Sequence, residues 1–386
     1  MSPNQRSAPA NAAVSPTFAE ALKVWLEIGL LSFGGPAGQI AMMHRMLVDE
    51  RKWIDEKSYL SALNFCMLLP GPEAMQLATY VGWRLHGVRG GLAAGLLFVL
   101  PGALFMLLLS TLYALYGKLP LAEALFVGIK AAVLAIVIEA LLKVSRRALK
   151  ANSDWVVAGV AFVAIYALGV PFPVIVLAAG LYGFLRGGPP VATAASATEP
   201  PTVLAGLEAA PASLRQTAVT IAIWIAIWIV PLLAVVAVFG RGHVLSELAW
   251  FFSKLAVVTF GGAYAVLAYM TQEVVQGYRW LQPGEMLDAL GLAETTPGPL
   301  ILVNQFVGAL AAFRHGGAGS IGIGPIWMSV LGAVVTLWAT FVPCFLWIFA
   351  GAPWIERLNR NPKLKSALQA VTAAVVGVIL NLTVWF

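Results

Sequence analysis

Charged residues are scarce in this chain, and so are cysteine and histidine. Only 11% of its 386 residues are Asp, Glu, Lys or Arg, against 60% hydrophobic residues and a mean hydropathy of +0.84. These values lie well outside the range of soluble domains and indicate a polytopic membrane protein. Two isolated cysteines, Cys66 and Cys344, exclude a disulfide framework, and the four histidines form no metal-ligand spacing with them.

The sequence also lacks the motifs of common enzymes. It has no P-loop, no G-x-G-x-x-G and no H-E-x-x-H. We therefore expect no cofactor, no metal site and no enzymatic activity, and a membrane-embedded enzyme is the weaker alternative. The formal charge of +6 comes from basic residues in short loops rather than from a basic stripe with interleaved aromatics, which argues against nucleic acid as a partner.

Long apolar stretches dominate what remains. A bilayer-spanning helix needs about 20 apolar residues, and the sequence predicts spans near 18–43, 60–83, 88–117, 121–143, 155–185, 215–240, 246–270, 286–312, 322–350 and 364–386. Pro171 and Pro173 interrupt the stretch 155–185, which favours a hairpin of two short helices there. The prediction is an all-α polytopic membrane protein with about ten or eleven crossings of the lipid bilayer.

A three-part signature occurs twice at one separation. Phe33-Gly34-Gly35 returns as Phe260-Gly261-Gly262, Trp53 as Trp280, and Pro70-Gly71-Pro72 as Pro297-Gly298-Pro299, each 227 residues later (260 − 33, 280 − 53 and 297 − 70). We therefore predict two transmembrane repeats, at 18–150 and 245–386, after a disordered tail at 1–17. A connector at 151–244 contains further spans and a Pro-, Ala- and Thr-rich soluble linker at 187–213.

The position of basic loops predicts the orientation of the repeats. Lys143 to Lys150 follow the last span of the first repeat, whereas Arg357 to Lys365 precede the last span of the second. Because cytoplasmic loops collect Lys and Arg, the two repeats point in opposite directions if both loops are cytoplasmic. We expect an inverted-topology repeat in the cytoplasmic (inner) membrane, with the N-terminus inside and the C-terminus outside.

Both repeated motifs break helices. Paired glycines let the chain leave helical geometry, and prolines remove backbone donors. Such breaks are tolerated at membrane depth only where protein or a water-filled cavity satisfies the exposed groups, and a helix that restarts there presents N–H groups and a positive dipole end to an anion. A kink or a close packing contact is the plainer alternative. The candidate anion-binding residues are Ser32, Gly34, Gly35, Asn64, Gly71, Gln76, Lys130, Gly261, Gly262, Thr295, Thr296, Gly298 and Asn304.

Charged residues near the breaks suggest further roles. Glu73 and Glu294 are candidate proton carriers, since protonation of a carboxylate beside an anion site would be coupled to binding, and a structural hydrogen bond is the alternative for each. Lys130 lies in the middle of a predicted span, where it is either an anion contact or the partner of Glu123. Glu27 and Lys254 are equivalent at offset 227, and their opposite signs suit a pair between the repeats.

Three segments together match a known pattern: Ser32-Phe33-Gly34-Gly35-Pro36, the run Pro70-Gly71-Pro72-Glu73-Ala74-Met75-Gln76-Leu77-Ala78-Thr79-Tyr80-Val81-Gly82-Trp83, and Phe98-Val99-Leu100-Pro101-Gly102. With these segments the chain resembles the chromate ion transporter (CHR) family in its long two-domain form. The resemblance covers both repeats, and it implies export of chromate from the cytoplasm, chromate resistance and two antiparallel halves. The second repeat departs from the pattern, with Ala263 in place of Pro36 and Leu300 in place of Glu73.

The most specific reading is a secondary carrier that exports chromate by alternating access. Sulfate or another oxyanion is an alternative substrate, because hydrogen-bond geometry discriminates poorly between isosteric dianions. An ion channel would need a continuous polar pore, and the inverted duplication argues against it. The sequence leaves the coupling ion and the oligomeric state open, a homodimer included.

Overall fold

The computed structural model describes residues 15–117, 148–187, 213–260, 263–317 and 322–385, with scattered positions between 119 and 146. Lys130, Gly261, Gly262, most of the predicted tail and nearly all of the predicted linker lie outside the described residues. The described part is helical and contains no strand. Its elements are α1 (Phe18–Leu31), α2 (Gly35–His44), η1 (Arg45–Glu50), α3 (Glu56–Leu68), α4 (Glu73–Tyr116), α6 (Asn152–Tyr166), α7 (Phe172–Arg186), α8 (Leu214–Phe239), α9 (Val244–Val258), α10 (Ala263–Gln272), η3 (Glu273–Gly277), α11 (Pro283–Thr295), η4 (Leu300–Leu302), α12 (Val303–His315), α13 (Pro325–Gly351), η5 (Ala352–Trp354), α14 (Ile355–Arg360) and α15 (Pro362–Trp385).

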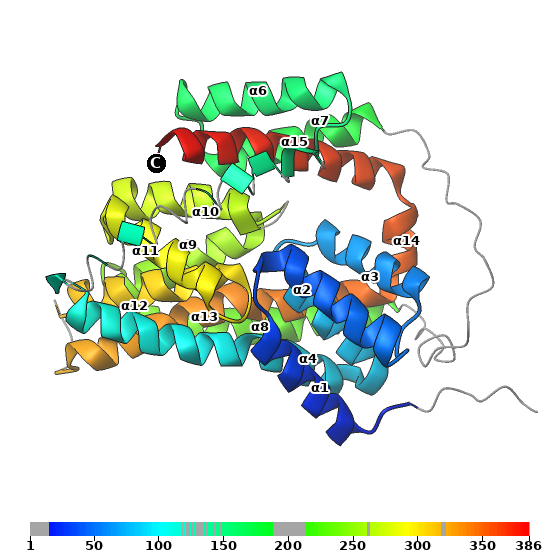
Figure 1. Cartoon of the computed structure of the whole chain (residues 1–386), viewed down its shortest axis with the longest axis horizontal. Helices are drawn as coiled ribbons and strands as arrows, with labels where there is room; N and C mark the ends of the chain where they lie inside the picture. Colours follow the sequence, from blue (N-terminus) through cyan, green and yellow to red (C-terminus); the bar gives the residue numbers. More distant parts are fainter. Residues whose placement is uncertain are drawn as a thin grey trace, which may run out of the picture.

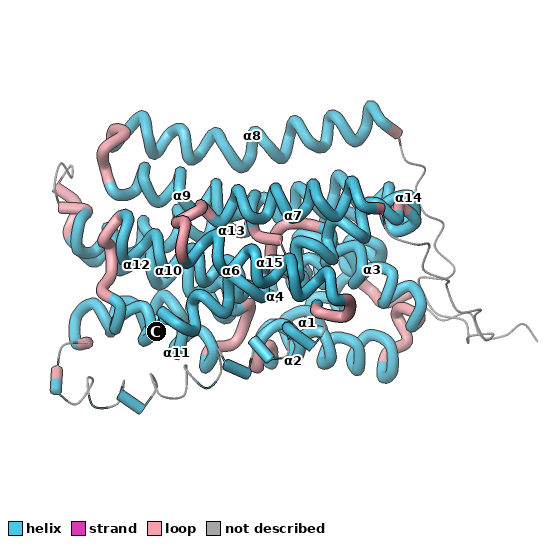
Figure 2. Tube along the Cα trace, turned by 90° about the horizontal axis from the view of Figure 1, so that it is seen from above, coloured by secondary structure: helices cyan, strands magenta, loops and turns pink. Residues whose placement is uncertain are grey.

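Four of these helices are long and apolar enough to cross a membrane: α4, α8, α13 and α15. The apolar window of α8 is only 11% buried, and Figure 2 shows this helix along one edge of the molecule. Exposed Leu, Ile and Val side chains on such a helix suit contact with lipid. The prediction of an all-α polytopic membrane protein is confirmed. The predicted hairpin within 155–185 is confirmed too, as α6 and α7 separated by a turn at 167–171.

The repeated motifs lie in repeated structure. Helix α1 corresponds to α9, α2 to α10 and α3 to α11, and the bounds of α3 and α11 differ by 227 at both ends (283 − 56 and 295 − 68). Each repeat passes through a short π-helix before its tryptophan, η1 in the first and η3 in the second. Trp53 N–H donates to Leu47 at 2.8 Å, and Trp280 N–H donates to Val274 at 2.9 Å, the equivalent bond.

Beyond the third motif the match continues with a changed offset. Helix α4 departs from helical geometry at His86 and Gly87 and folds back on itself. A Cβ atom on Gly82 would lie 2.6 Å from the Cβ of Ala94, whereas residues twelve apart in a straight helix are about 18 Å apart. In the second repeat Gly308 approaches the Thr336 side chain in the same way. Gly308 is therefore the equivalent of Gly82, at an offset of 226 (308 − 82), and Thr336 is the equivalent of Ala94, at an offset of 242 (336 − 94). The difference between the two offsets means that the second repeat has 16 additional residues between these positions, where α12 is connected to α13.

The predicted spans 60–83 and 286–312 are not single helices. The first is divided between α3 and the start of α4, and the second between α11 and α12. Helices α3, α11 and α12 have 13 residues each, which gives about 20 Å of length against a hydrocarbon core of about 30 Å. Each is therefore too short to cross the core alone.

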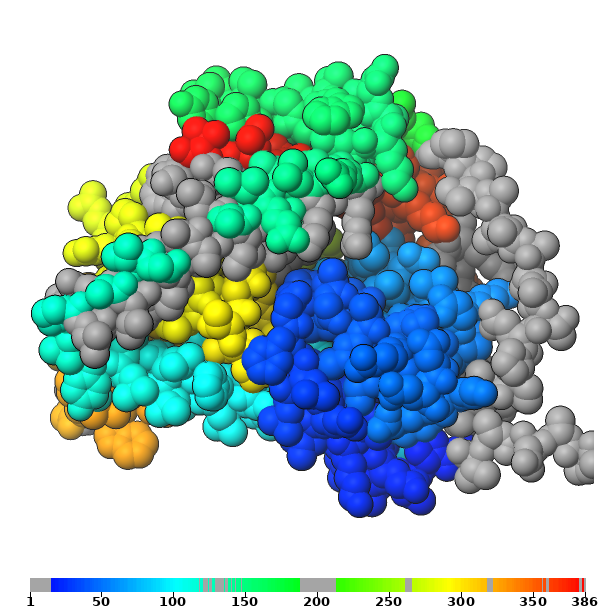
Figure 3. Space-filling view, in the orientation of Figure 1, coloured from blue at the N-terminus to red at the C-terminus, as the bar shows by residue number. Residues whose placement is uncertain are grey.

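The helices form two blocks and a covering layer (Figure 1). Helices α1–α3 occupy one side and α9–α12 the other; α4 packs against both blocks, and α13 packs against α4, α9 and α12. Helix α15 packs on α6 and α7, and these three form the layer at the top of Figure 1. In the space-filling view the first repeat (blue) abuts the yellow atoms of the second (Figure 3).

Close packing of glycines predicts a sharp effect of one methyl group. A Cβ atom on Gly332 would collide with the carbonyl oxygen of Gly308 and lie 2.5 Å from the Cβ of Ala312. We expect Gly332→Ala to lower the free energy of unfolding by about 1–3 kcal/mol, the usual range for overpacking. Gly159→Ala is the matched control, since no atom lies within 4 Å of its added Cβ. Thermal unfolding of detergent-purified protein tests this, and equal midpoints for the two variants would contradict the assigned packing.

Candidate functional site

All four repeated motifs interrupt helices, as the sequence predicts. Helix α1 ends at Leu31 and α2 begins at Gly35, while α3 ends at Leu68 and α4 begins at Glu73. In the second repeat α9 ends at Val258, before the Phe-Gly-Gly motif, and α11 ends at Thr295, before Pro-Gly-Pro. Gly34 and Gly35 have φ of 81° and 70°, a left-handed conformation in which a side chain is unfavourable.

The residue before each Phe-Gly-Gly motif ends its helix in the same way. The Ser32 hydroxyl donates to the Ile28 carbonyl at 2.6 Å, and the Thr259 hydroxyl donates to the Leu255 carbonyl at 2.5 Å. Both side chains are buried. A hydroxyl bonded back to its own helix competes with the backbone ladder and favours a helix end. Ser32, predicted as a ligand residue, thus uses its hydroxyl hydrogen to end α1.

Two hydrogen bonds join the repeats at the breaks. Gly71 N–H donates to the Thr259 carbonyl at 2.9 Å, and Gly298 N–H donates to the Ser32 carbonyl at 2.8 Å. Adding 227 to Gly71 and Ser32 gives Gly298 and Thr259, so the two bonds are the same contact with the repeats exchanged. Each Pro-Gly-Pro motif is therefore held against the residue that precedes the Phe-Gly-Gly motif of the other repeat.

The central glycines of the two Pro-Gly-Pro motifs cannot be replaced without strain. Gly71 has φ of 120° and Gly298 has φ of 93°. A Cβ on Gly71 would lie 2.9 Å from Gln76 Nε2 and 3.0 Å from Cys344 Sγ, and one on Gly298 would lie 2.9 Å from Leu302 Cδ1. At both central positions, therefore, the backbone conformation and the lack of space favour glycine over any residue with a side chain.

The second half of α4 and helix α13 also contact the Pro-Gly-Pro motif of the other repeat. Cys344 of α13 lies beside Gly71, and a Cβ on Gly102 of α4 would collide with the Pro297 carbonyl. Gly102 and Cys344 differ by 242 (344 − 102), and each follows a proline inside its helix, Pro101 and Pro343. Each Pro-Gly-Pro motif therefore touches the other repeat both at the Phe-Gly-Gly break and at a proline-containing helix.

The helices that begin at the breaks have no side-chain cap, a feature that they share with α7, α8 and α13. Side chains cap the beginnings of α1 (Thr17), α3 (Asp55), α9 (His243) and α11 (Gln282 with Glu285). In contrast, α2, α4 and η4 begin at breaks behind Gly34, Pro72 and Pro299 and have no side-chain cap. An uncapped first turn leaves N–H groups without an intrahelical partner, and N–H groups arranged in this way are suited to bind an anion.

Buried carboxamides occupy the breaks. Gln39 of α2, which sequence reasoning missed, donates from Nε2 to the Gly298 carbonyl at 2.6 Å and to the Ser32 carbonyl at 3.2 Å. Gln76 donates to the Pro70 carbonyl at 2.8 Å. Both side chains are almost fully buried. They donate hydrogen bonds to carbonyl groups that the breaks leave without helical partners. The only feature of the sequence that pointed to Gln39 was its position as a polar residue within an apolar span.

Other predicted residues divide into buried and accessible sets. Thr296, Asn304, Gln76 and the two central glycines are buried, whereas Asn64, Gly34 and Thr295 are exposed. Thr296 donates to the Ala293 carbonyl at 3.2 Å, and Asn304 donates to Thr340 Oγ1 at 3.3 Å. Gln305 donates to Ala103 of the first repeat at 2.8 Å. Thr295 also donates back to its own helix, to Gly291 at 3.0 Å.

Two acidic residues lie beside the breaks, at non-equivalent positions. Glu73 is the first residue of α4, directly after the first Pro-Gly-Pro motif, and Glu294 is in the last turn of α11, three residues before the second. Both are half-buried. The expected pair between Glu27 and Lys254 is wrong: Glu27 pairs with Arg51 at 3.1 Å, and Lys254 bonds Tyr269 at 2.9 Å, each within its own repeat. Within the described residues no three His, Cys, Asp or Glu gather as metal ligands.

Comparison with known proteins identifies the family. The family model described as chromate transporter matches residues 19–184 and 246–386. A chromate transport protein of Pseudomonas aeruginosa is 34% identical over 92% of this chain and 77% of its own length. A probable chromate transport protein of Synechococcus elongatus is 29% identical over 93% of this chain and 82% of its own.

A chromate transport protein of Cupriavidus metallidurans is 28% identical over 98% of this chain and 85% of its own length. No solved structure matches the chain significantly. These relatives carry the names of transport proteins and not of enzymes, which agrees with the expectation of a carrier. Because the family model covers both repeats, this chain belongs to the chromate transporter family.

Proposed function

We propose that this protein exports chromate from the cytoplasm across the inner membrane by alternating access and thereby confers chromate resistance. The observation that carries the proposal is the reciprocal pair of hydrogen bonds from Gly71 to Thr259 and from Gly298 to Ser32. It joins interrupted, uncapped helices of two repeats, and family membership supplies the substrate class. Relatives in two bacteria are named chromate transport proteins.

In the proposed site, backbone N–H groups are the main hydrogen-bond donors to chromate. Chromate is a dianion with four oxygens, and the uncapped turns of α2 and α4 and the chain before α12 offer N–H groups and positive dipole ends. Asn64 and Thr295, which are exposed, and Gly34 are open to a ligand in this state. The whole proposed set is Ser32, Gly34, Gly35, Asn64, Gly71, Gln76, Lys130, Gly261, Gly262, Thr295, Thr296, Gly298 and Asn304.

We propose that the two repeats are inverted in the membrane. Reciprocal contacts such as Gly71 to Thr259 and Gly298 to Ser32 are what a pseudo-two-fold axis between the repeats produces. An axis in the membrane plane would place both basic loops in the cytoplasm, the N-terminus inside and the C-terminus outside. Rocking of one repeat against the other would then open the site alternately to each side.

Glu73 and Glu294 are the proposed proton carriers. Glu73 directly follows the first Pro-Gly-Pro motif, Glu294 lies three residues before Pro297 of the second, and each is half-buried. An ionised carboxylate repels a dianion, so protonation would favour loading and deprotonation would favour release. Sulfate, which has the same shape and charge, is the alternative substrate.

Replacing either central glycine tests the shared site. We expect Gly71→Val and Gly298→Val each to reduce chromate transport at least tenfold, since the new side chain strains a positive-φ residue by about 1–2 kcal/mol and displaces the crossing bond. The matched control is Gly240→Val, which has φ of 85° with no atom within 4 Å of its added Cβ. Uptake into everted vesicles at equal membrane abundance is the measurement, and normal uptake by both glycine variants would rule out this site.

Transport itself is tested in the same everted vesicles with labelled chromate. Export in the cell becomes uptake in this preparation, so we expect accumulation that excess sulfate reduces if the site accepts both dianions. Collapse of the proton gradient should slow uptake if Glu73 and Glu294 carry protons. Absence of chromate accumulation would contradict the proposed substrate or direction.

Terminal tags test the inversion. We expect an N-terminal tag to be protected from protease in intact spheroplasts and a C-terminal tag to be accessible. Inverted repeats require an odd number of crossings from the start of one repeat to the start of the other, and the four spans predicted within 245–386 then leave the two termini on opposite faces. Permeabilised cells give the control for tag cleavage. Two tags on the same face would contradict the inversion and leave the substrate unaffected.

A further inference from the structure

Equivalent segments of the two repeats are held by different kinds of contact. The segment α2–η1–α3, residues 35–68, corresponds to residues 262–295 of the second repeat. Resting on the proposed alternating access, we infer that residues 35–68 are the moving part of the transporter and that residues 263–295 belong to a fixed scaffold. We call these the mobile segment and the scaffold segment.

An aromatic cluster fixes the scaffold segment to α9. Phe251 of α9 contacts Tyr278 and Trp280 with ring centroids 5.3 and 5.8 Å apart, and the latter two stack at 4.3 Å. Tyr269 of α10 joins the cluster, stacks on Phe172 of α7 at 5.4 Å and accepts a hydrogen bond from Lys254. Buried aromatic contacts of this kind resist separation.

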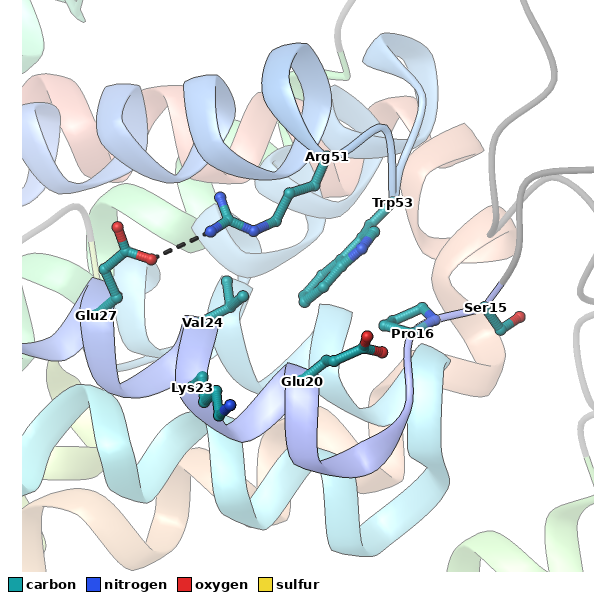
Figure 4. Close-up of a pocket in the computed structure, with 8 residues that line it drawn as sticks. All are labelled: Ser15, Pro16, Glu20, Lys23, Val24, Glu27, Arg51 and Trp53. Carbon is teal, nitrogen blue, oxygen red and sulfur yellow. Dashed lines mark hydrogen bonds and ion pairs between the residues drawn. The ribbon is translucent and has the colours of Figure 1, made fainter.

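The equivalent place in the first repeat is a cavity. Val24 stands where the second repeat has Phe251, and Arg51 stands where it has Tyr278, while Trp53 and Trp280 are the same residue type. A cavity of about 500 Å³ lies there, lined by Ser15, Pro16, Glu20, Lys23, Val24, Glu27, Arg51 and Trp53. Figure 4 shows Arg51 extending to Glu27, with Val24 and Trp53 beside the pair.

One aromatic contact, between Trp25 of α1 and Trp53 at 6.1 Å, lies at the cavity, and the polar contacts around it are weak. Arg51 pairs with Glu27 at 3.1 Å and with Glu50 at 3.5 Å, and these carboxylates are about half exposed. Solvent-exposed ion pairs contribute little to stability. Within the mobile segment, Tyr59 of α3 donates to the Ile40 carbonyl of α2 at 2.6 Å, so its two helices are tied to each other.

Helix α11 has two further attachments through acidic side chains, at positions where α3 has serines. Tyr113 of α4 donates to Asp288 at 2.8 Å, and Arg314 of α12 forms a two-pronged pair with Glu285 at 2.6 and 2.7 Å. Asp288 is buried. The positions equivalent to Glu285 and Asp288 are Ser58 and Ser61, and a serine cannot form the charged pair.

Side chains of α3 are also more exposed than the equivalent side chains of α11. Leu60 and Met67 of α3 are 45% and 53% exposed. Their equivalents in α11, Leu287 and Glu294, are half-buried, and Gly291 is buried where α3 has the exposed Asn64. Gly34 and Gly35, at the start of the mobile segment, have positive φ, and no atom lies within 4 Å of a Cβ added to Gly34, which allows a pivot beside the substrate site.

Hydrogen–deuterium exchange of the full-length protein in nanodiscs tests the asymmetry without any substrate. We expect peptides from 45–68 to exchange at least about tenfold faster than peptides from 272–295, because local opening follows weak packing. Equal exchange in the two segments, or faster exchange in 272–295, would overturn the inference. This result is independent of whether chromate is the substrate.

Filling the cavity tests whether the motion is needed for transport. We expect Val24→Phe, which copies the second repeat, to slow chromate uptake at least about tenfold while chromate binding, measured by thermal shift, stays within about threefold of wild type. Val160→Phe, on an exposed face of α6, is the matched control. Wild-type uptake by Val24→Phe would overturn the inference and leave the proposed function standing. If Val24→Phe does not fold, the exchange experiment decides.

Discussion

A broken helix inside a membrane has N–H and C=O groups that lipid cannot satisfy, and this protein answers that constraint by using one break to satisfy another. Gly71 donates to Thr259 and Gly298 donates to Ser32, so neither Pro-Gly-Pro motif is complete without the other repeat. The carboxamides of Gln39 and Gln76 satisfy further carbonyl groups at the same places. The uncapped helix starts beside these bonds are the residual N–H groups from which we build the proposed substrate site.

The same arrangement explains why the two repeats need not be equal. The pseudo-symmetric pair of breaks depends on the two hydrogen bonds between the repeats, which are formed by backbone groups. The side chains around the breaks can therefore differ between the repeats. Phe251 and Tyr278 fill a space in the second repeat that Val24 and Arg51 leave open in the first. The chromate transporter family model spans both repeats, and within them we infer that residues 35–68 move while residues 263–295 hold position.

The sequence predicted the breaks because glycine pairs and prolines act locally, and it predicted the α6–α7 hairpin for the same reason. Hydropathy alone drew 60–83 as one span, because it averages over the four-residue interruption at 69–72, whereas the Pro-Gly-Pro motif predicted the break there. The role of Gln39 was not predictable, because its partners Ser32 and Gly298 are seven and 259 positions away in the chain. Glu27 and Lys254 were paired by sign alone, whereas nearer partners, Arg51 and Tyr269, satisfy them.

The most direct measurement is the position of chromium in chromate-soaked crystals of the full-length protein, from anomalous diffraction at the chromium absorption edge. The account predicts one strong peak beside the two crossing bonds, within hydrogen-bonding reach of the uncapped starts of α2 and α4 or of the chain between Gly298 and α12. Chromium bound only elsewhere, with those helix starts facing lipid or protein, would contradict it.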